Sequence, residues 1–162
     1  MMIRKSKILC ILAITFYCFL DVFGNVSDYY INFAAVKRTL MMNDIFPDSL
    51  IGYRAITNPI LHHAIYLVII GFELLTTIIC GVGAWKLFKV RHANAFVFNG
   101  AKSWAVAGLT LGFLTWNVLF MSVAGEWFGL WMSSLLSGAL TTSFQIFITF
   151  LVLLIYLIIK DE

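Results

Sequence analysis

The chain has 162 residues and a formal net charge of +3, and 62% of its residues are hydrophobic while only 12% are charged. Soluble domains carry about twice that share of charged residues, and a soluble fold with so much apolar surface would have to expose much of it. The charge is too small for a nucleic-acid binder, and no basic stripe interleaved with aromatic residues is present. The composition therefore predicts an integral membrane protein, whose apolar surface is solvated by lipid.

Four segments are apolar enough to cross a bilayer, which requires about 20 mainly apolar residues. They are roughly residues 8–26, 60–85, 104–124 and 136–159. Basic residues precede the first segment as in a signal peptide, but no small-residue cleavage site follows, so we expect a retained helix. The sequence predicts an all-α fold in which residues 1–162 form one membrane four-helix bundle, with an external helical loop at 27–58 between the first two spans.

The basic residues predict the orientation of these spans. Because Lys and Arg near the ends of spans stay on the cytoplasmic side, the side that holds eight of them is predicted to be cytoplasmic, and the side that holds three to be external. Both termini then lie in the cytoplasm. The eight are Arg4, Lys5, Lys7, Lys86, Lys89, Arg91, Lys102 and Lys160, and the three are Lys37, Arg38 and Arg54.

The external loop at 27–58 contains a helical pattern. Tyr29, Phe33, Val36 and Leu40 recur at helical spacing behind Ser27, which we expect to cap the helix. This pattern predicts an amphipathic helix that lies on the membrane surface or over the bundle, or one that only fills the gap between two spans. Further on, Asp48-Ser49 is expected to cap a short helix, and Asn58-Pro59 to open the second span.

Glu73 lies near the middle of the second predicted span, where an acidic residue costs on the order of 3 kcal/mol. Asn117 and Gln145, in the third and fourth spans, are the expected partners for a cross-helix hydrogen bond. Tyr66 and Thr77 share the helix face of Glu73 but reach its carboxyl group only through bending or water. Glu73 is predicted either to form a proton, cation or ligand site, or to join helices as a neutral carboxyl group.

Four polar residues fall at the outer ends of the first three predicted spans. They are Asp21, His62, His63 and Glu126, which could converge in one layer. Imidazole and carboxylate groups together suit a transition metal. Adjacent histidines on a helix point about 100° apart, however, so interfacial hydrogen bonding is the favoured prediction and a metal site the alternative.

The turn between the third and fourth spans, Gly125–Trp131, is rich in aromatic residues. Trp127, Phe128 and Trp131 are predicted either to anchor the protein at the headgroup level or to form a contact surface for a partner or lipid. In the third span, Gly108 and Gly112 form a GxxxG motif, which lets helix backbones approach closely within one chain or between two copies of it.

Catalytic motifs are absent from the sequence. The three cysteines lie singly inside apolar runs, which predicts small buried side chains rather than a disulfide or a redox pair. There is no HExxH, GxGxxG or phosphate-loop motif and no Ser/His/Asp arrangement. The sequence therefore assigns no cofactor and does not support an enzymatic role. The expected partners are the lipid bilayer and a membrane protein or a second copy of the chain, and not nucleic acid.

Several short stretches occur together in an order that resembles a bacterial family of predicted small integral membrane proteins with a domain of unknown function. The resemblance implies a bacterial inner-membrane protein with four spans and one domain, and it carries no catalytic or binding residues. The stretches are Gly24-Asn25, Asp28-Tyr29, Asn32-Phe33, Phe46-Pro47, Arg54-Ala55-Ile56, Pro59, Leu61-His62-His63, Glu73, Lys102, Gly112-Phe113, Trp116 and Gly125-Glu126-Trp127-Phe128.

Together these features predict a non-enzymatic accessory or scaffolding subunit that binds a partner, a lipid or a small ligand at its external face. One alternative is a proton-linked transporter or ion pathway that uses Glu73. A second is a metal or redox site at the outer helix ends.

Overall fold

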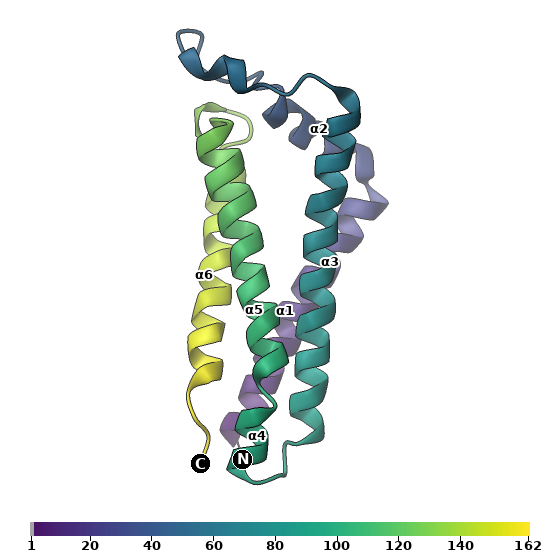
Figure 1. Cartoon of the computed structure of the whole chain (residues 1–162), viewed down its shortest axis with the longest axis vertical. Helices are drawn as coiled ribbons and strands as arrows, with labels where there is room; N and C mark the ends of the chain where they lie inside the picture. Colours follow the sequence, from purple (N-terminus) through teal and green to yellow (C-terminus); the bar gives the residue numbers. More distant parts are fainter. Residues whose placement is uncertain (1) are drawn as a thin grey trace.

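A computed structural model describes residues 2–162, which form long helices with a smaller helical layer at one end (Figure 1). Among these residues there is no strand, and four helical stretches are long and apolar enough to cross a membrane: α1, α3, the run from α4 to η2, and α6. The predicted all-α membrane bundle is confirmed. The elements are α1 (Met2–Ser27), α2 (Tyr29–Leu40), the 3₁₀ helix η1 (Leu50–Arg54), α3 (Pro59–Lys89), α4 (Ala95–Gly100), α5 (Ser103–Leu114), the π-helix η2 (Thr115–Trp127), the 3₁₀ helix η3 (Leu130–Met132) and α6 (Gly138–Ile158).

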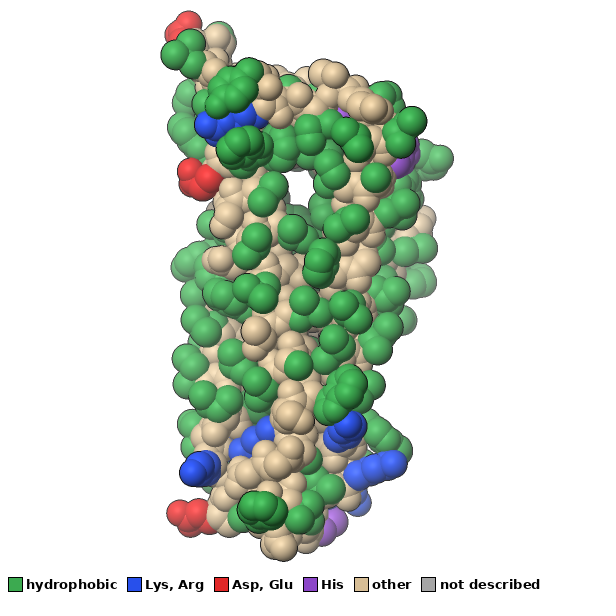
Figure 2. Space-filling view, viewed as in Figure 1, with side chains coloured by type: hydrophobic (Ala, Val, Ile, Leu, Met, Phe, Trp, Pro, Cys, Tyr) green, Lys and Arg blue, Asp and Glu red, His purple; other side chains and the backbone are tan. Residues whose placement is uncertain are grey.

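Both ends of the chain lie at the same end of the bundle, which we call the terminal end (Figure 1). The opposite end, called the loop end, carries α2, η1 and η3. On the face shown in Figure 2, most Lys and Arg side chains gather near the terminal end, below a broad hydrophobic band. The basic residues that predicted the orientation therefore lie at the end where the two termini meet.

Three charged side chains hold the chain's last residues at the terminal end. The Lys7 and Lys102 ammonium groups lie 2.8 and 2.6 Å from the Asp161 carboxylate, and both donate to the carbonyl of Ile159. Burial by itself would raise the pKa of Asp161, but the hydrogen bonds from Lys102 and Lys7 lower it below its ordinary value. α1 runs from Met2 to Ser27, so the helix extends beyond the predicted span of about residues 8–26.

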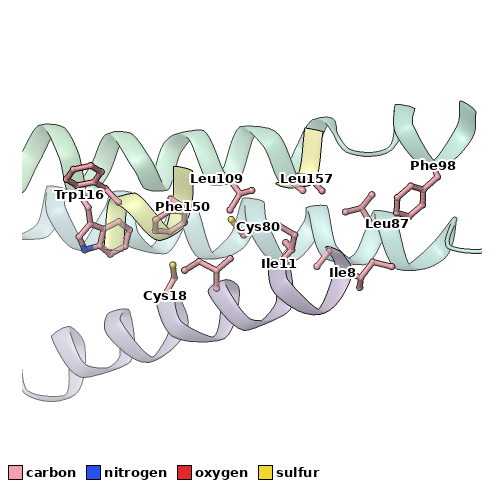
Figure 3. Packing of buried hydrophobic residues seen from close by; sticks show 14 residues of the cluster. Ile8, Ile11, Cys18, Cys80, Leu87, Phe98, Leu109, Trp116, Phe150 and Leu157 are labelled. Carbon is pink, nitrogen blue, oxygen red and sulfur yellow. The ribbon is translucent and has the colours of Figure 1, made fainter. Parts of the chain in front are cut away.

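Apolar side chains from α1, α3, α5 and α6 form the core of the bundle (Figure 3). Cys18 and Cys80 are fully buried there as free thiols, as predicted. A Cβ on Gly108 would lie 2.6 Å from the Cys80 Sγ, and one on Gly112 would collide with the ring of Phe150. The GxxxG motif therefore packs within the chain, against α3 on one side and α6 on the other.

The start of α3 matches its predicted signal, whereas the start of α2 does not. The Asn58 side chain accepts a hydrogen bond from the Ile60 backbone N–H at 2.9 Å, which caps α3. The prediction that Ser27 caps the external helix is wrong, because its hydroxyl donates to the Phe23 carbonyl at 2.7 Å within α1. Asp28 stands at the start of α2 without a side-chain cap hydrogen bond. The short helix expected after Asp48-Ser49 is η1, but the predicted cap is wrong, because Ser49 at its start makes no side-chain cap hydrogen bond.

Candidate functional site

A polar cluster joins α1 to α3 inside the bundle, with Glu73 at its centre. The Glu73 side chain is 1% exposed, and its Oε2 accepts a hydrogen bond from the Asn25 side-chain amide at 2.8 Å. The Tyr66 hydroxyl donates to the Asn25 Oδ1 at 3.0 Å. Tyr66 and Glu73 lie two turns apart on one face of α3, so both reach Asn25 without bending of the helix.

Asp21 belongs to the same polar cluster. It precedes Asn25 by one turn of α1 and shares its face, which brings its carboxyl group close to that of Glu73. The cluster thus places two carboxyl groups and an amide between two membrane-spanning helices.

Aromatic side chains of α2 pack over the first turns of α3. The ring of Phe33 stacks on that of His63 with centroids 4.0 Å apart, and the Tyr29 hydroxyl is hydrogen-bonded to the His63 Nδ1 at 2.9 Å. The Tyr29 ring also contacts the Tyr66 ring, at a centroid distance of 4.8 Å. The amphipathic helix predicted in the external loop therefore lies with its aromatic face on α3.

The four residues predicted to share an outer layer are not brought together. Asp21 faces the polar cluster, and His63 contacts α2. The His62 Nε2 is hydrogen-bonded to the Ile56 carbonyl at 2.7 Å, and Glu126 is exposed beside an open groove. Within residues 2–162, no three His, Cys, Asp or Glu side chains are close enough to hold a metal ion.

The aromatic turn at the loop end is partly buried. Trp127 and Trp131 are 52% and 51% exposed, but Phe128 is only 6% exposed because it packs beside Leu40 in a small hydrophobic cluster under the loop. The Arg54 guanidinium lies 4.5 Å from the centroid of the Trp127 ring and donates to the Trp127 carbonyl. Of the three predicted contact residues, only the two tryptophans offer an exposed surface.

An apolar cavity of about 380 Å³ lies in the half of the bundle next to the loop end. Its walls come from α2, α3, η2 and the start of α6, and include Val36, Ala64, Val68 and Val123. It forms where η2 diverges from α3, and Figure 2 shows an opening there, just beneath the layer at the loop end. A long π-helix is unusual, since π-helical segments are mostly single turns and are frequent at functional sites.

A second, more polar pocket adjoins this cavity, and Ala35 lines both. Lys37, Arg38 and Asn43 contribute to the second pocket. Arg38 donates two hydrogen bonds to the Asp44 carboxylate, which lowers the pKa of Asp44. Lys37 is exposed, and no ion pair involves it in the part of the chain that the structure describes.

Residues 3–160 match a family described as "Predicted small integral membrane protein (DUF2165)". The chain belongs to this family. No curated protein and no solved structure matches it. The DUF2165 family thus supports a multi-pass integral membrane protein.

Two predicted members of the Glu73 site form no hydrogen bond with Glu73 in the described part of this DUF2165 protein. The side chains of Asn117 and Gln145 make no hydrogen bond within the described residues, where other side chains donate only to their backbone carbonyls, and the side chain of Gln145 is exposed on α6. The sequence prediction missed Asn25, which takes their place as the partner of Glu73. The available signal was the four-residue spacing of Asp21 and Asn25, which puts two polar side chains on one face of the first span.

Proposed function

We propose that this DUF2165 protein is a non-enzymatic accessory or scaffolding subunit that binds one anionic phospholipid at its loop end. The observation that carries the proposal is the apolar cavity of about 380 Å³ with a basic pocket beside it. The cavity takes one acyl chain, and the basic pocket takes the phosphate of the headgroup.

The position and lining of the cavity favour an acyl chain. Its volume is within the range of small-molecule pockets, about 300–1,000 Å³, and its walls are almost entirely apolar. It lies between two membrane-spanning helices, where the surrounding solvent is the hydrocarbon of the bilayer. An empty cavity would leave its lining without van der Waals contacts on one side, and an acyl chain that enters from the bilayer restores them.

The charges in the adjoining pocket favour an anionic headgroup. Asp44 offsets the charge of Arg38, whereas the ammonium group of Lys37 is exposed beside the amide of Asn43. An ammonium group and an amide can both donate to phosphate oxygens. A basic side chain near an anionic surface contributes about 1 kcal/mol of attraction.

We further propose that the protein lies in a bacterial inner membrane with both termini in the cytoplasm. The gathering of Lys and Arg near the terminal end supports this orientation, which places the lipid pocket in the outer leaflet. Reporter fusions to the two ends of the chain test it. Activity of a periplasm-dependent reporter at either end would overturn it.

Purification of the full chain in a mild detergent, followed by mass spectrometry of bound lipid, tests the lipid site. Ala64→Phe fills the cavity, and Ala13→Phe makes the same change at an exposed position of α1 away from the cavity. Lys37→Gln removes the charge from the basic pocket, and Lys5→Gln removes one at the terminal end.

We expect about one anionic phospholipid per chain in the wild type and in the two controls, and a loss of several-fold in Ala64→Phe and Lys37→Gln. Absence of bound lipid from the wild type would overturn the proposal. So would equal loss from test and control variants, or retention of zwitterionic lipid alone.

A second candidate function is a proton pathway through Glu73, favoured by the burial of its carboxyl group between two spans and by its hydrogen bond with Asn25 of the other span. Reconstituted vesicles that contain a pH-sensitive dye test it. Glu73→Gln is expected to abolish a proton flux that Glu126→Gln, a change of the exposed acid at the loop end, leaves intact. An equal flux in both variants, or none in the wild type under any gradient, would rule this function out.

A further inference from the structure

The side of α6 that faces away from the bundle carries an amide without a partner. Ser143 and Phe147 are buried against the other helices, and Gln145 lies two residues from each. At about 100° per residue, Gln145 is therefore on the opposite side of the helix, and its side chain is exposed. No hydrogen bond to its amide group is found among residues 2–162, where the Thr149 hydroxyl donates only to its backbone carbonyl.

Gln145 is deep enough in the bilayer for an amide without a hydrogen-bond partner to be costly. It follows Gly138, the first residue of α6, by seven positions, about 10 Å at a rise of about 1.5 Å per residue. An amide without a partner is unfavourable in hydrocarbon. By contrast, the hydroxyls of Thr142 and Thr149 donate to carbonyls of their own helix, whereas the Gln145 amide makes no such bond.

We propose that this face of α6 is the interface of a symmetric homodimer, in which the two Gln145 amides form hydrogen bonds with each other across the two-fold axis. A primary amide is both a donor and an acceptor, so it is complementary to its own copy in an isologous contact. Gly138, Thr141 and Thr149 are small and lie on the same face, which lets two helices approach closely. This interface is separate from the proposed lipid pocket and does not depend on it.

Cysteine cross-linking of the full chain in its native membrane tests the contact. Gln145→Cys is made in a Cys10→Ala background, since the other two cysteines are fully buried. The matched control is Leu67→Cys, which is exposed on α3 eight residues from the loop-end start of that helix. A mild oxidant is expected to cross-link Gln145→Cys into a dimer and to leave Leu67→Cys monomeric. Equal cross-linking of the two, or none at Gln145→Cys, would overturn the interface.

Energy transfer between labelled chains in liposomes measures the strength of the dimer. Gln145→Leu is expected to raise the dissociation constant about thirtyfold, because interhelical hydrogen bonds in membranes contribute about 1 kcal/mol each and two are lost. The thermal unfolding temperature of the monomer should be unchanged, because the Gln145 side chain forms no hydrogen bond with the rest of the bundle. A monomeric wild type would refute the proposal, as would a dissociation constant that the substitution leaves the same.

Discussion

A close approach of α3 and α5 at Gly83 offers a test of the packing. At Gly83 of α3, an added Cβ would lie 2.5 Å from the backbone nitrogen of Ala105 and 2.6 Å from its Cα. Ordinary van der Waals contact begins at 3.4 Å, so α3 and α5 would have to separate by about 1 Å locally. Gly83→Ala therefore overpacks a backbone contact that no side-chain rotation can relieve.

The magnitude follows from a comparison with a second glycine of the same helix. Gly71 has no atom within 4 Å of an added Cβ, so Gly71→Ala brings only the helix-propensity gain of about 0.5–1 kcal/mol. Gly83→Ala brings the same gain and an overpacking penalty of about 1–3 kcal/mol. The difference between the two variants in free energy of unfolding should therefore be about 1–3 kcal/mol, with Gly83→Ala the less stable.

Reversible unfolding in mixed micelles, by titration of a denaturing detergent, measures this difference. The five tryptophans supply the fluorescence signal, and far-UV circular dichroism confirms that each variant begins from the same helical content. Equal stability of the two variants would refute the close packing of α3 on α5.

Two further changes test the helix ends with the same unfolding assay. Asp161→Asn leaves the buried ammonium groups of Lys7 and Lys102 without a counter-ion and should lower the free energy of unfolding by about 3 kcal/mol. Because the folded-state pKa of Asp161 is below its ordinary value of 3.8, the stabilisation of the wild type is present above about pH 4 and is lost as the pH falls through the folded pKa. An Asp161→Asn variant that loses as much free energy of unfolding in acid as the wild type would contradict this. Asn58→Ala removes the cap of α3 and should lower the free energy of unfolding by about 1 kcal/mol. The Ile60 N–H, which donates to the Asn58 side chain in the wild type, should exchange faster with solvent; unchanged exchange there would contradict the cap.

The predictions for individual residues succeeded where the physical cause is local. Asn58 caps α3 as expected, because the bond joins its side chain to the backbone N–H of Ile60, only two residues away. The external helix formed because the apolar positions from Tyr29 to Leu40 repeat at the helical period. The cap by Ser27 failed because a serine hydroxyl can also bond to the carbonyl four residues earlier, and the helix of the first span continues through that position.

The polar site depends on contacts that are distant in the sequence. Glu73 was recognised as an intramembrane acid, but Asn25 lies 48 residues away, and no local pattern says which span faces which. Gln145 was expected to turn toward Glu73 and instead lies on the outer side of α6, because the rotation of a helix about its axis is set by how its bulky residues pack. Lys7 and Lys102 were used only as signals of orientation, and their burial against Asp161 required the folded chain.

The amino-acid sequence by itself determined that this protein has four membrane-spanning helices, because the transfer of apolar residues from water to lipid depends on composition and length alone. Only the tertiary structure decided the rest: which polar groups meet Glu73, that η2 diverges from α3 to open an apolar cavity, and that one face of α6 keeps an unpaired amide. Lipid solvates every apolar face of a helix almost equally, so hydrophobicity does not choose the faces that pack. Close contacts at glycines and hydrogen bonds between spans make that choice, and these exist only once the helices are assembled.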